Sequence, residues 1–188
     1  MKAEEAYFAG ALCDAYLDRK RNEIQLYQKN KEWLVKMNDL LYKIAGKKGK
    51  IFERDVFLLR KRDKDMFAKI EQIVSEKPDP MEFFISGLFD SEGSIYLSSK
   101  SKIPVVDITQ SEKGKHLLDW TQHFLEEKGI PSKLNGPYKH RASKLEMYHL
   151  RIYGVKNCKR FFLLSPTLHP EKRKKIQLLL ELTVDPKL

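Results

Sequence analysis

One segment of the chain joins a run of apolar and small residues directly to two acidic residues and a glycine. It reads Phe83-Phe84-Ile85-Ser86-Gly87-Leu88-Phe89-Asp90-Ser91-Glu92-Gly93. The run predicts a helix, and the closing glycine permits a sharp exit from it. Because the helix macrodipole disfavours anions at a helix C-terminus, the carboxylates of Asp90 and Glu92 indicate a function such as holding a cation.

A weaker copy of this segment lies near the N-terminus. It reads Ala6-Tyr7-Phe8-Ala9-Gly10-Ala11-Leu12-Cys13-Asp14-Ala15-Tyr16-Leu17. When Asp14 is matched to Glu92, a shift of 78 residues, small residues coincide with small residues. Matching Gly10 to Gly87 instead would place Ala15 at the acidic position and leave that half without its acid.

The sequence that follows each copy is repeated as well. Residues 23–31 resemble residues 105–113, since both alternate apolar and polar residues before a glutamine, a pattern typical of half-buried strands. A third match joins residues 58–60 to residues 149–151. The growing shift between the matches is explained by longer hairpin loops in the second copy. The chain is therefore interpreted as a duplication.

Each half is expected to have the order αββαββα, which makes the fold class α+β. In the first half we expect helices near 3–14, 30–45 and 63–75, and strands near 16–20, 22–28, 48–53 and 55–61. In the second half we expect helices near 80–91, 112–128 and 155–163, and strands near 94–99, 104–110, 131–137 and 146–153. A last amphipathic helix should begin at 169–171 and end near Leu182, with a proline in its first turn.

Two closely spaced prolines mark the boundary between the halves. Pro78 and Pro80 stop a helix, and Asp79 between them is able to cap the next one. We expect the first half at residues 1–76, a linker at 77–80, and the second half with its C-terminal helix at 81–188.

These motifs resemble those of the LAGLIDADG homing endonucleases, in the single-chain form that carries two copies. Residues 87–93 follow the order of the family, including the acid just before the last glycine. The first motif differs, with Ala15 in place of that glycine and Leu12 in place of the earlier acid. We match it through Asp14, because residues 14–17 then resemble the Asp-Gly-Tyr-Leu ending of many relatives. The resemblance implies a duplicated αββαββα fold with two pseudo-two-fold related halves and a saddle of antiparallel strands.

The resemblance also implies site-specific cleavage of both strands of a long double-stranded DNA target, by a chain that acts as a monomer. Two phosphodiester bonds must be broken, and a duplicated chain presents one acid to each. Small residues at 9–11 and 86–87 would let the two motif helices pack backbone to backbone, which would bring Asp14 and Glu92 together. Carboxylates suit Mg²⁺, and two or three such ions are expected between the halves.

Further active-site roles come from the resemblance alone. It implies that the backbone carbonyls of Cys13 and Ser91 help to hold metal, and that Gln28 and Gln110 position water or phosphate. Alternatively, both glutamines only satisfy backbone groups at strand ends. Asp90, whose counterpart is Leu12, is interpreted as a residue that caps or hydrogen-bonds the end of its own helix.

DNA recognition is expected on the hairpins, whose strands can enter the major groove. By alternation Glu23 and Asp107 share the face that is expected to contact DNA. The side chains expected to bind DNA are Arg19, Arg21, Gln25, Tyr27, Lys29, Arg60, Arg62, Tyr96, Ser98, Lys100, Thr109, Lys133, Asn135, Lys139, Arg141 and Arg151. Lys29, Lys100 and the cluster 172–175 are candidates for the basic residues that complete the active sites, although such a cluster is as often a solvated helix face.

The composition agrees with this interpretation. The formal charge of +10 favours a polyanionic partner. No apolar run is long enough to span a membrane, and acids at the start of the chain are atypical of a secretory signal, so we expect an intracellular protein, cytoplasmic or organellar. Cys13 and Cys158 form neither a disulfide framework nor a zinc pattern.

Two alternatives to the endonuclease remain: an RNA-binding intron maturase, and a non-cutting DNA-binding regulator on the same scaffold.

Overall fold

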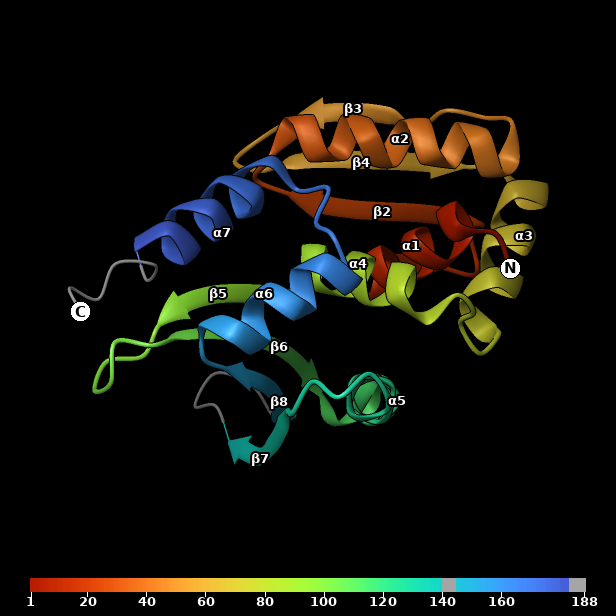
Figure 1. Cartoon of the computed structure of the whole chain (residues 1–188). Coiled ribbons are helices and arrows are strands. Elements are labelled where there is room, and N and C mark those ends of the chain that lie inside the picture. Colours follow the sequence, from red (N-terminus) through yellow and green to blue (C-terminus); the bar gives the residue numbers. More distant parts are fainter. Residues whose placement is uncertain (140–144, 183–188) are drawn as a thin grey trace. The chain divides into compact units, whose positions relative to one another are not determined.

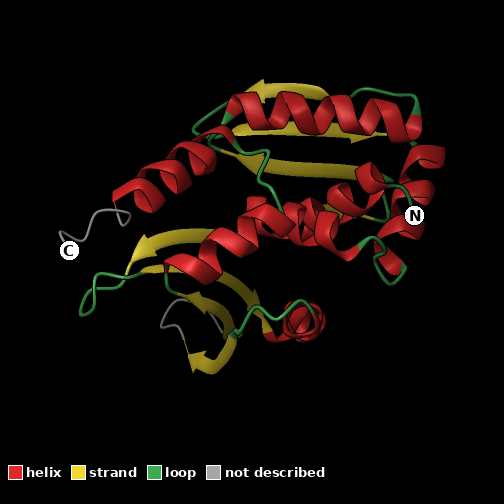
Figure 2. Cartoon of the chain, in the orientation of Figure 1, coloured by secondary structure: helices red, strands yellow, loops and turns green. Residues whose placement is uncertain are grey.

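The computed structural model describes residues 1–139 and 145–182, which form two compact units (Figure 1). The first unit comprises Met1–Ser91 together with the short segment Leu168–Pro170. The second begins at Glu92, continues to Thr167 and resumes at Glu171. Helices and antiparallel strands are mixed within each unit (Figure 2). No helix in these described ranges is both long and apolar enough to cross a membrane.

The first unit is built on a four-stranded antiparallel sheet with the strand order β1-β2-β4-β3. Its strands are β1 (Tyr16–Asp18), β2 (Glu23–Gln28), β3 (Lys50–Glu53) and β4 (Phe57–Arg62). Its helices are α1 (Ala3–Ala11), α2 (Lys31–Ala45), α3 (Lys64–Ser75) and α4 (Met81–Glu92), the last residue of which belongs to the second unit. One face of the sheet carries the buried side chains of Ile24, Leu26 and Leu59 and packs toward α2 and α3.

Local sequence signals explain where these helices begin and end. The Asn30 side chain accepts a hydrogen bond from the Trp33 backbone nitrogen at 2.8 Å, and the Asp63 side chain accepts one from the Met66 nitrogen at 3.0 Å. Both are N-caps that satisfy otherwise unpaired first-turn donors. Gly46 ends α2 in the left-handed conformation, with a φ of 69°, which a glycine adopts without strain.

The second unit repeats the sheet with the order β5-β6-β8-β7. Its strands are β5 (Gly93–Leu97), β6 (Pro104–Ser111), β7 (Lys133–Lys139) and β8 (Glu146–Tyr153). Helices α5 (Lys115–Glu127) and α6 (Val155–Leu164) pack on β6 and β8, and α7 (Pro170–Leu182) closes the described chain. The expected α+β class with a duplicated strand order is therefore confirmed. The division into halves at 77–80 stays a prediction.

The helix ends differ from expectation in two places. The helix expected at 3–14 is α-helical only to Ala11 and finishes as a 3₁₀ turn, Leu12–Asp14. The helix expected at 112–128 starts with a 3₁₀ turn, Glu112–Gly114, before α5. Each difference lies at a terminus, where i→i+3 bonds commonly tighten a helix. The helix α7 begins at Pro170, as expected.

Helices α1 and α4 meet through two glycines. A Cβ atom added at Gly10 would lie 2.7 Å from the Leu88 nitrogen and closer still to the Phe84 carbonyl oxygen. A Cβ atom added at Gly87 would lie 2.8 Å from the Ala11 nitrogen and closer still to the Tyr7 carbonyl oxygen. The two helix backbones therefore touch, and only glycine allows this approach.

We expect Gly10→Ala and Gly87→Ala each to lower the free energy of unfolding, by about 1–3 kcal/mol, because the added methyl group must push two backbones apart. Urea denaturation followed by circular dichroism would measure the loss. Gly46→Asn is the matched control, because a side chain there meets nothing within 4 Å and asparagine tolerates the left-handed conformation. Wild-type stability in both variants would contradict the close contact.

Candidate functional site

Both motif helices end in an acid immediately before a strand. Asp14 is the last residue of the 3₁₀ turn that extends α1, and β1 starts two residues later. Glu92 is the last residue of α4, and β5 starts at the next residue, Gly93. The local sequence thus places one carboxylate at each helix-to-strand junction.

The 3₁₀ turn resolves the one-residue mismatch between the two motifs. Gly10 and Gly87 are equivalent in the helix contact, yet Asp14 follows its glycine by four residues and Glu92 follows by five. Five α-helical residues rise about 7.5 Å. One α-helical step followed by three 3₁₀ steps also rises about 7.5 Å, because each 3₁₀ residue rises about 2.0 Å. Ideal helix geometry therefore gives Asp14 about the same axial distance from the glycine contact as Glu92.

The residues that precede the acids are held by their own helices. The Cys13 Sγ donates to the Ala9 carbonyl at 3.6 Å. The Ser91 Oγ lies 3.2 Å from the Leu88 carbonyl oxygen and 3.4 Å from the Gly10 carbonyl oxygen, so it bridges α4 and α1. These bonds fix the backbone whose carbonyl groups are candidate metal donors.

The donor set available at these junctions consists of oxygen atoms. Across residues 1–139 and 145–182 there is no group of three His, Cys, Asp or Glu side chains that could hold a metal by itself. A metal held here would therefore rely on single carboxylates, backbone carbonyls and water. Such a set fits Mg²⁺, which prefers oxygen ligands and keeps several of its waters.

The two candidate glutamines have different surroundings. The Gln28 Oε1 accepts a hydrogen bond from the Lys29 backbone nitrogen at 2.8 Å, so it satisfies a backbone group at the end of β2. Gln110 is only 7% exposed, and its Nε2 finds no hydrogen-bond partner within the part of the chain that the structure describes. A Cβ atom at Gly114 would lie 3.0 Å from the Gln110 Cδ, so the glycine leaves room for this amide. A buried unpaired donor is costly and calls for an explanation.

Asp90, which we expected to cap or hydrogen-bond the end of its own helix, also binds groups that lie far from it in the sequence. Its buried Oδ2 accepts hydrogen bonds from the Tyr7 hydroxyl at 2.7 Å, the Leu168 nitrogen at 2.7 Å and the His169 nitrogen at 3.1 Å. Tyr7 also accepts a bond from Trp33 Nε1 at 2.9 Å. Burial and the neighbouring Asp90 charge raise the pKa of Tyr7, which keeps its proton for this bond. Asp90 therefore fastens the segment before α7 to α1.

One member of the basic cluster 172–175 reaches a motif. Lys172 Nζ donates to the Gly93 carbonyl oxygen at 2.6 Å, at the residue directly after Glu92. Arg173 Nη2 donates to the Thr167 carbonyl at 2.9 Å, and the other two lysines of the cluster are exposed. Lys172 is thus the member of this cluster that contacts the second motif through a hydrogen bond to Gly93, whereas Arg173 contacts Thr167.

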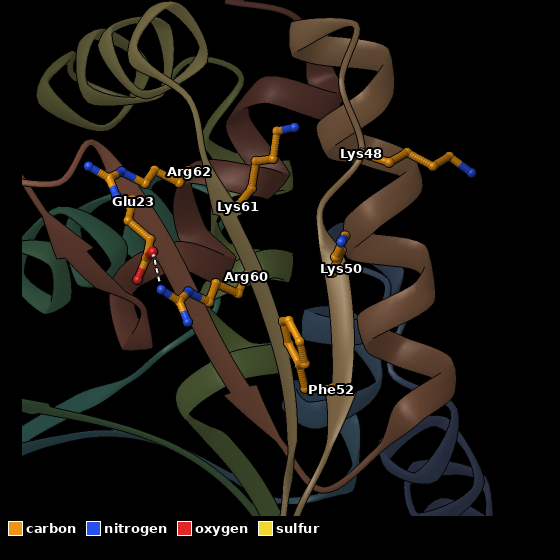
Figure 3. Close-up of a pocket in the computed structure, with 7 residues that line it drawn as sticks. All are labelled: Glu23, Lys48, Lys50, Phe52, Arg60, Lys61 and Arg62. Atoms are coloured by element: carbon orange, nitrogen blue, oxygen red, sulfur yellow. Dashed lines mark ion pairs between the residues drawn. The ribbon is translucent and has the colours of Figure 1, made fainter.

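The open face of the first sheet carries a basic cavity of about 340 Å³ (Figure 3). Phe52 and the carboxylate of Glu23 lie among basic side chains in its wall. The basic side chains that line the cavity are Lys48, Lys50, Arg60, Lys61 and Arg62.

A buried carboxylate and a partly exposed arginine form an ion pair among the residues that line this cavity. Glu23 is 0% exposed, and its Oε2 lies 2.7 Å from Arg60 Nη2, the pair joined by a dashed line in Figure 3. Burial alone would raise the pKa of Glu23, but hydrogen bonds from Arg60 and Gln25 outweigh it and hold that pKa below its usual value. Tyr27 extends the chain of contacts by donating to Gln25 Oε1 at 2.7 Å.

The open face of the second sheet has its own acid-centred cluster. Asp107 accepts hydrogen bonds from Arg151 Nε at 2.9 Å and from the Tyr96 hydroxyl at 3.1 Å, and it lies 3.0 Å from His149 Nδ1. Burial would lower the pKa of Arg151, but the bond and charge of Asp107 raise it above its usual value. Thr109 completes the cluster, 3.1 Å from the same histidine nitrogen.

The structure sorts the residues that we expected to bind DNA into strands and turns. Residues in strands with side chains on the open faces, by register, are Gln25, Tyr27, Arg60, Arg62, Tyr96, Thr109, Lys133, Asn135 and Arg151. Lys139 ends β7 and is exposed. Residues at turns or strand ends are Arg19, Arg21, Lys29, Ser98 and Lys100. Arg141 lies outside the described residues.

Sequence reasoning missed several residues of these faces. Lys50 lies directly across from Arg60, and His149 directly across from Thr109. Alternation gives the face of a side chain but not its partner on the next strand, so neither pairing was accessible without the strand register.

The geometry defines a class of protein: two α+β units with the same strand order, and two glycine-packed motif helices that each end in an acid. Residues 79–164 match the family model of the LAGLIDADG-like domain. Over this stretch the chain is similar to a LAGLIDADG-like domain, and it has the fold of solved LAGLIDADG homing endonuclease structures, which confirms the resemblance seen in the motifs.

Solved structures show the same fold over nearly the whole chain. A structure of I-DmoI in complex with DNA and Ca has a TM-score of 0.65 at 19% identity, covering 93% of this chain and 97% of that one. The meganuclease I-SmaMI bound to uncleavable DNA has a TM-score of 0.66 at 11% identity, covering 98% and 91%. The LAGLIDADG homing endonuclease I-GzeII in complex with its DNA target has a TM-score of 0.64 at 11% identity, covering 96% and 89%. None of the curated proteins compared with the chain matches it.

The Glu23–Arg60 pair should make the stability of the folded protein depend on pH in the acidic range. Because the pKa of Glu23 is lower in the folded than in the unfolded state, its contribution to stability is present at neutral pH. That contribution should decline as the pH falls below the ordinary glutamate value of roughly 4.3 and vanish below the folded-state pKa. Urea denaturation at pH 7 to pH 3 would show wild type and Glu23→Gln converging in stability. A difference that stays constant with pH would contradict the ion pair.

Proposed function

We propose that the chain is a site-specific homing endonuclease that makes a double-strand cut in a long DNA target by metal-dependent phosphodiester hydrolysis. The observation that carries the proposal is the pair of glycine-packed motif helices, each of which leads to a carboxylate at its junction with a strand. Similar structures bound to DNA support the choice of substrate. The proposed halves are residues 1–76 and 81–188, joined by the linker 77–80, in a chain that acts as a monomer.

Duplex DNA suits the charge of the chain. The formal charge is +10, and both open sheet faces carry arginines and lysines in their strands. Polar and charged side chains on strands can read base edges in the major groove, while lysines and arginines bind phosphates. A sheet face with these residues is therefore suited to a DNA duplex.

Asp14 and Glu92 are the proposed metal-binding acids, with the backbone carbonyls of Cys13 and Ser91 as further donors. The similar structures of I-DmoI with Ca and with Mn support the use of a divalent ion, and two or three Mg²⁺ ions are proposed. When bound, such ions activate water and stabilise the oxygen that leaves the phosphate.

Two other side chains have proposed roles in positioning. The buried, unpaired amide nitrogen of Gln110 is suited to donate a hydrogen bond to a water or phosphate oxygen. Gln28 is the proposed counterpart in the first half. Lys172, held at the Gly93 carbonyl, is the proposed basic residue of the second motif.

Glu92→Gln should abolish cleavage and leave binding of the DNA target within a few-fold of wild type, because it removes a metal-binding charge and keeps the shape of the side chain. The target would first be obtained by cleaving a randomised duplex library with Mg²⁺. Binding would be measured with Ca²⁺ and cleavage with Mg²⁺, and Glu76→Gln, an exposed acid, serves as the control. If binding fell together with cleavage, Glu92 would be structural.

Asp14→Asn should leave at most nicking of one strand, since each acid is proposed to serve one phosphodiester bond. A supercoiled plasmid that carries the target distinguishes nicked circles from linear product. Asp79→Asn, another exposed acid, is the control. Full double-strand cutting by Asp14→Asn would overturn the match between Asp14 and Glu92.

A further inference from the structure

The two sheets contain the same row of positions on their open faces. In the first sheet Gln25 lies directly across from Arg60, which in turn lies directly across from Lys50. In the second sheet the corresponding row contains Asp107, Arg151 and Lys133. Each row therefore has an arginine on the third strand of its sheet, β4 or β8. Arg60 and Arg151 are also matched to each other by the sequence repeat.

Each of these arginines is held by a buried carboxylate. Arg60 Nη2 lies 2.7 Å from the fully buried Glu23, and Arg151 Nε lies 2.9 Å from Asp107, whose side chain is 7% exposed. The arginine side chains themselves remain 41% and 26% exposed. The acid comes from a different position in each sheet, residue 23 or residue 107, although the arginines are equivalent. The shared feature is thus an arginine held on a buried carboxylate, through its terminal Nη2 in Arg60 and through its Nε in Arg151, with part of the side chain exposed on the sheet face.

A lysine lies directly across from each arginine, and the repulsion between the two positive charges destabilises the row unless an anion binds over it. Like charges directly opposite each other on neighbouring strands destabilise a sheet, and both rows place Lys directly across from Arg. The carboxylate offsets the charge of the arginine and leaves that of the lysine. A polyanion over the face would offset the remainder.

We propose that Arg60 and Arg151 are a matched pair of base-reading residues, one on each sheet, and that each recognises a guanine in the major groove of the target. This inference rests on the proposed DNA-binding function and names the base that the site takes. Lys50 and Lys133, next to them, supply phosphate contacts.

Guanine is favoured by the chemistry of a fixed arginine. A guanidinium is planar, and its fork of donors matches the O6 and N7 acceptors of guanine in two parallel hydrogen bonds. Holding one edge of the group on a carboxylate removes much of the rotamer freedom that binding would otherwise cost. The bond to the carboxylate uses Nε in Arg151 and Nη2 in Arg60, so it occupies neither terminal nitrogen of Arg151 and only one of the two in Arg60.

The test is a comparison of base preferences. Full-length wild type, Arg60→Lys and Arg151→Lys would each be used to select binding sites from a randomised duplex library with Ca²⁺ present. Each variant keeps its charge, so overall salt dependence should stay the same. Each should lose guanine discrimination at one base pair, by roughly 5- to 150-fold, and the two variants should affect different base pairs.

Two further variants separate base reading from folding. Arg54→Lys, in the exposed turn between β3 and β4, should leave the preference map unchanged. Asp107→Asn keeps the size of the side chain but loosens Arg151, so it should weaken discrimination at the base pair that Arg151→Lys affects. Thermal unfolding of every variant would show whether it is folded in the assay.

The outcomes are distinct. A wild-type site whose guanine preferences survive both arginine variants would overturn this inference and leave the proposed endonuclease intact. Selection of no discrete DNA site by wild type, with binding to RNA instead, would overturn the proposed function and the inference together. Loss of a guanine preference in each variant, at separate base pairs, would establish the pair.

Discussion

The contact between Gly10 and Gly87 is the constraint on which the motif geometry depends. It lets the backbone of α1 touch the backbone of α4, and any larger residue at either position would meet a carbonyl oxygen and an amide nitrogen of the partner helix. The acids follow from this contact, because each lies at a fixed rise beyond its glycine. In α4 that rise takes five α-helical residues, and in α1 four residues suffice because the last three form a 3₁₀ turn. The first motif, although its sequence is degenerate, thus keeps about the same rise from its glycine to its acid as the second motif.

Asp90, the earlier of the two acids in the stronger motif, has a structural role. Asp90 is buried and its carboxylate binds Tyr7 and the backbone of residues 168–169, while Trp33 packs its ring 5.6 Å from that of His169. Removing such a partner would leave several buried donors unsatisfied, each at a cost of about 1–3 kcal/mol. The segment that Asp90 binds follows α6 in the second half, which gives a physical reason why the acid is present in the second motif and Leu12 occupies the corresponding place in the first. The duplication therefore diverged where the two halves have different neighbours.

Much of the fold could be predicted from the sequence. Alternation identified the strands, and a proline in the first turn located α7, because these features depend on residues a few positions apart. The acids at the helix ends could be found for the same reason. The partners of Asp90 could not, since they lie 78 to 83 residues away along the chain. Nor could the Glu23–Arg60 pair, which joins neighbouring rows of two strands and depends on their register.

The open faces divide their positive charge between two kinds of residue. Arg60 and Arg151 are held by carboxylates, so their charge is largely offset within the protein and they add little to long-range attraction. Lys50 and Lys133 lie directly across from them, and we propose that these lysines supply the attraction to phosphates. Attraction to any duplex and discrimination between duplexes are then separate properties of neighbouring side chains, because the first depends on net charge and the second on a fixed donor geometry. The buried acids of a strongly basic chain are thus part of the proposed recognition surface, since each of them holds one of the arginines that we propose to read bases.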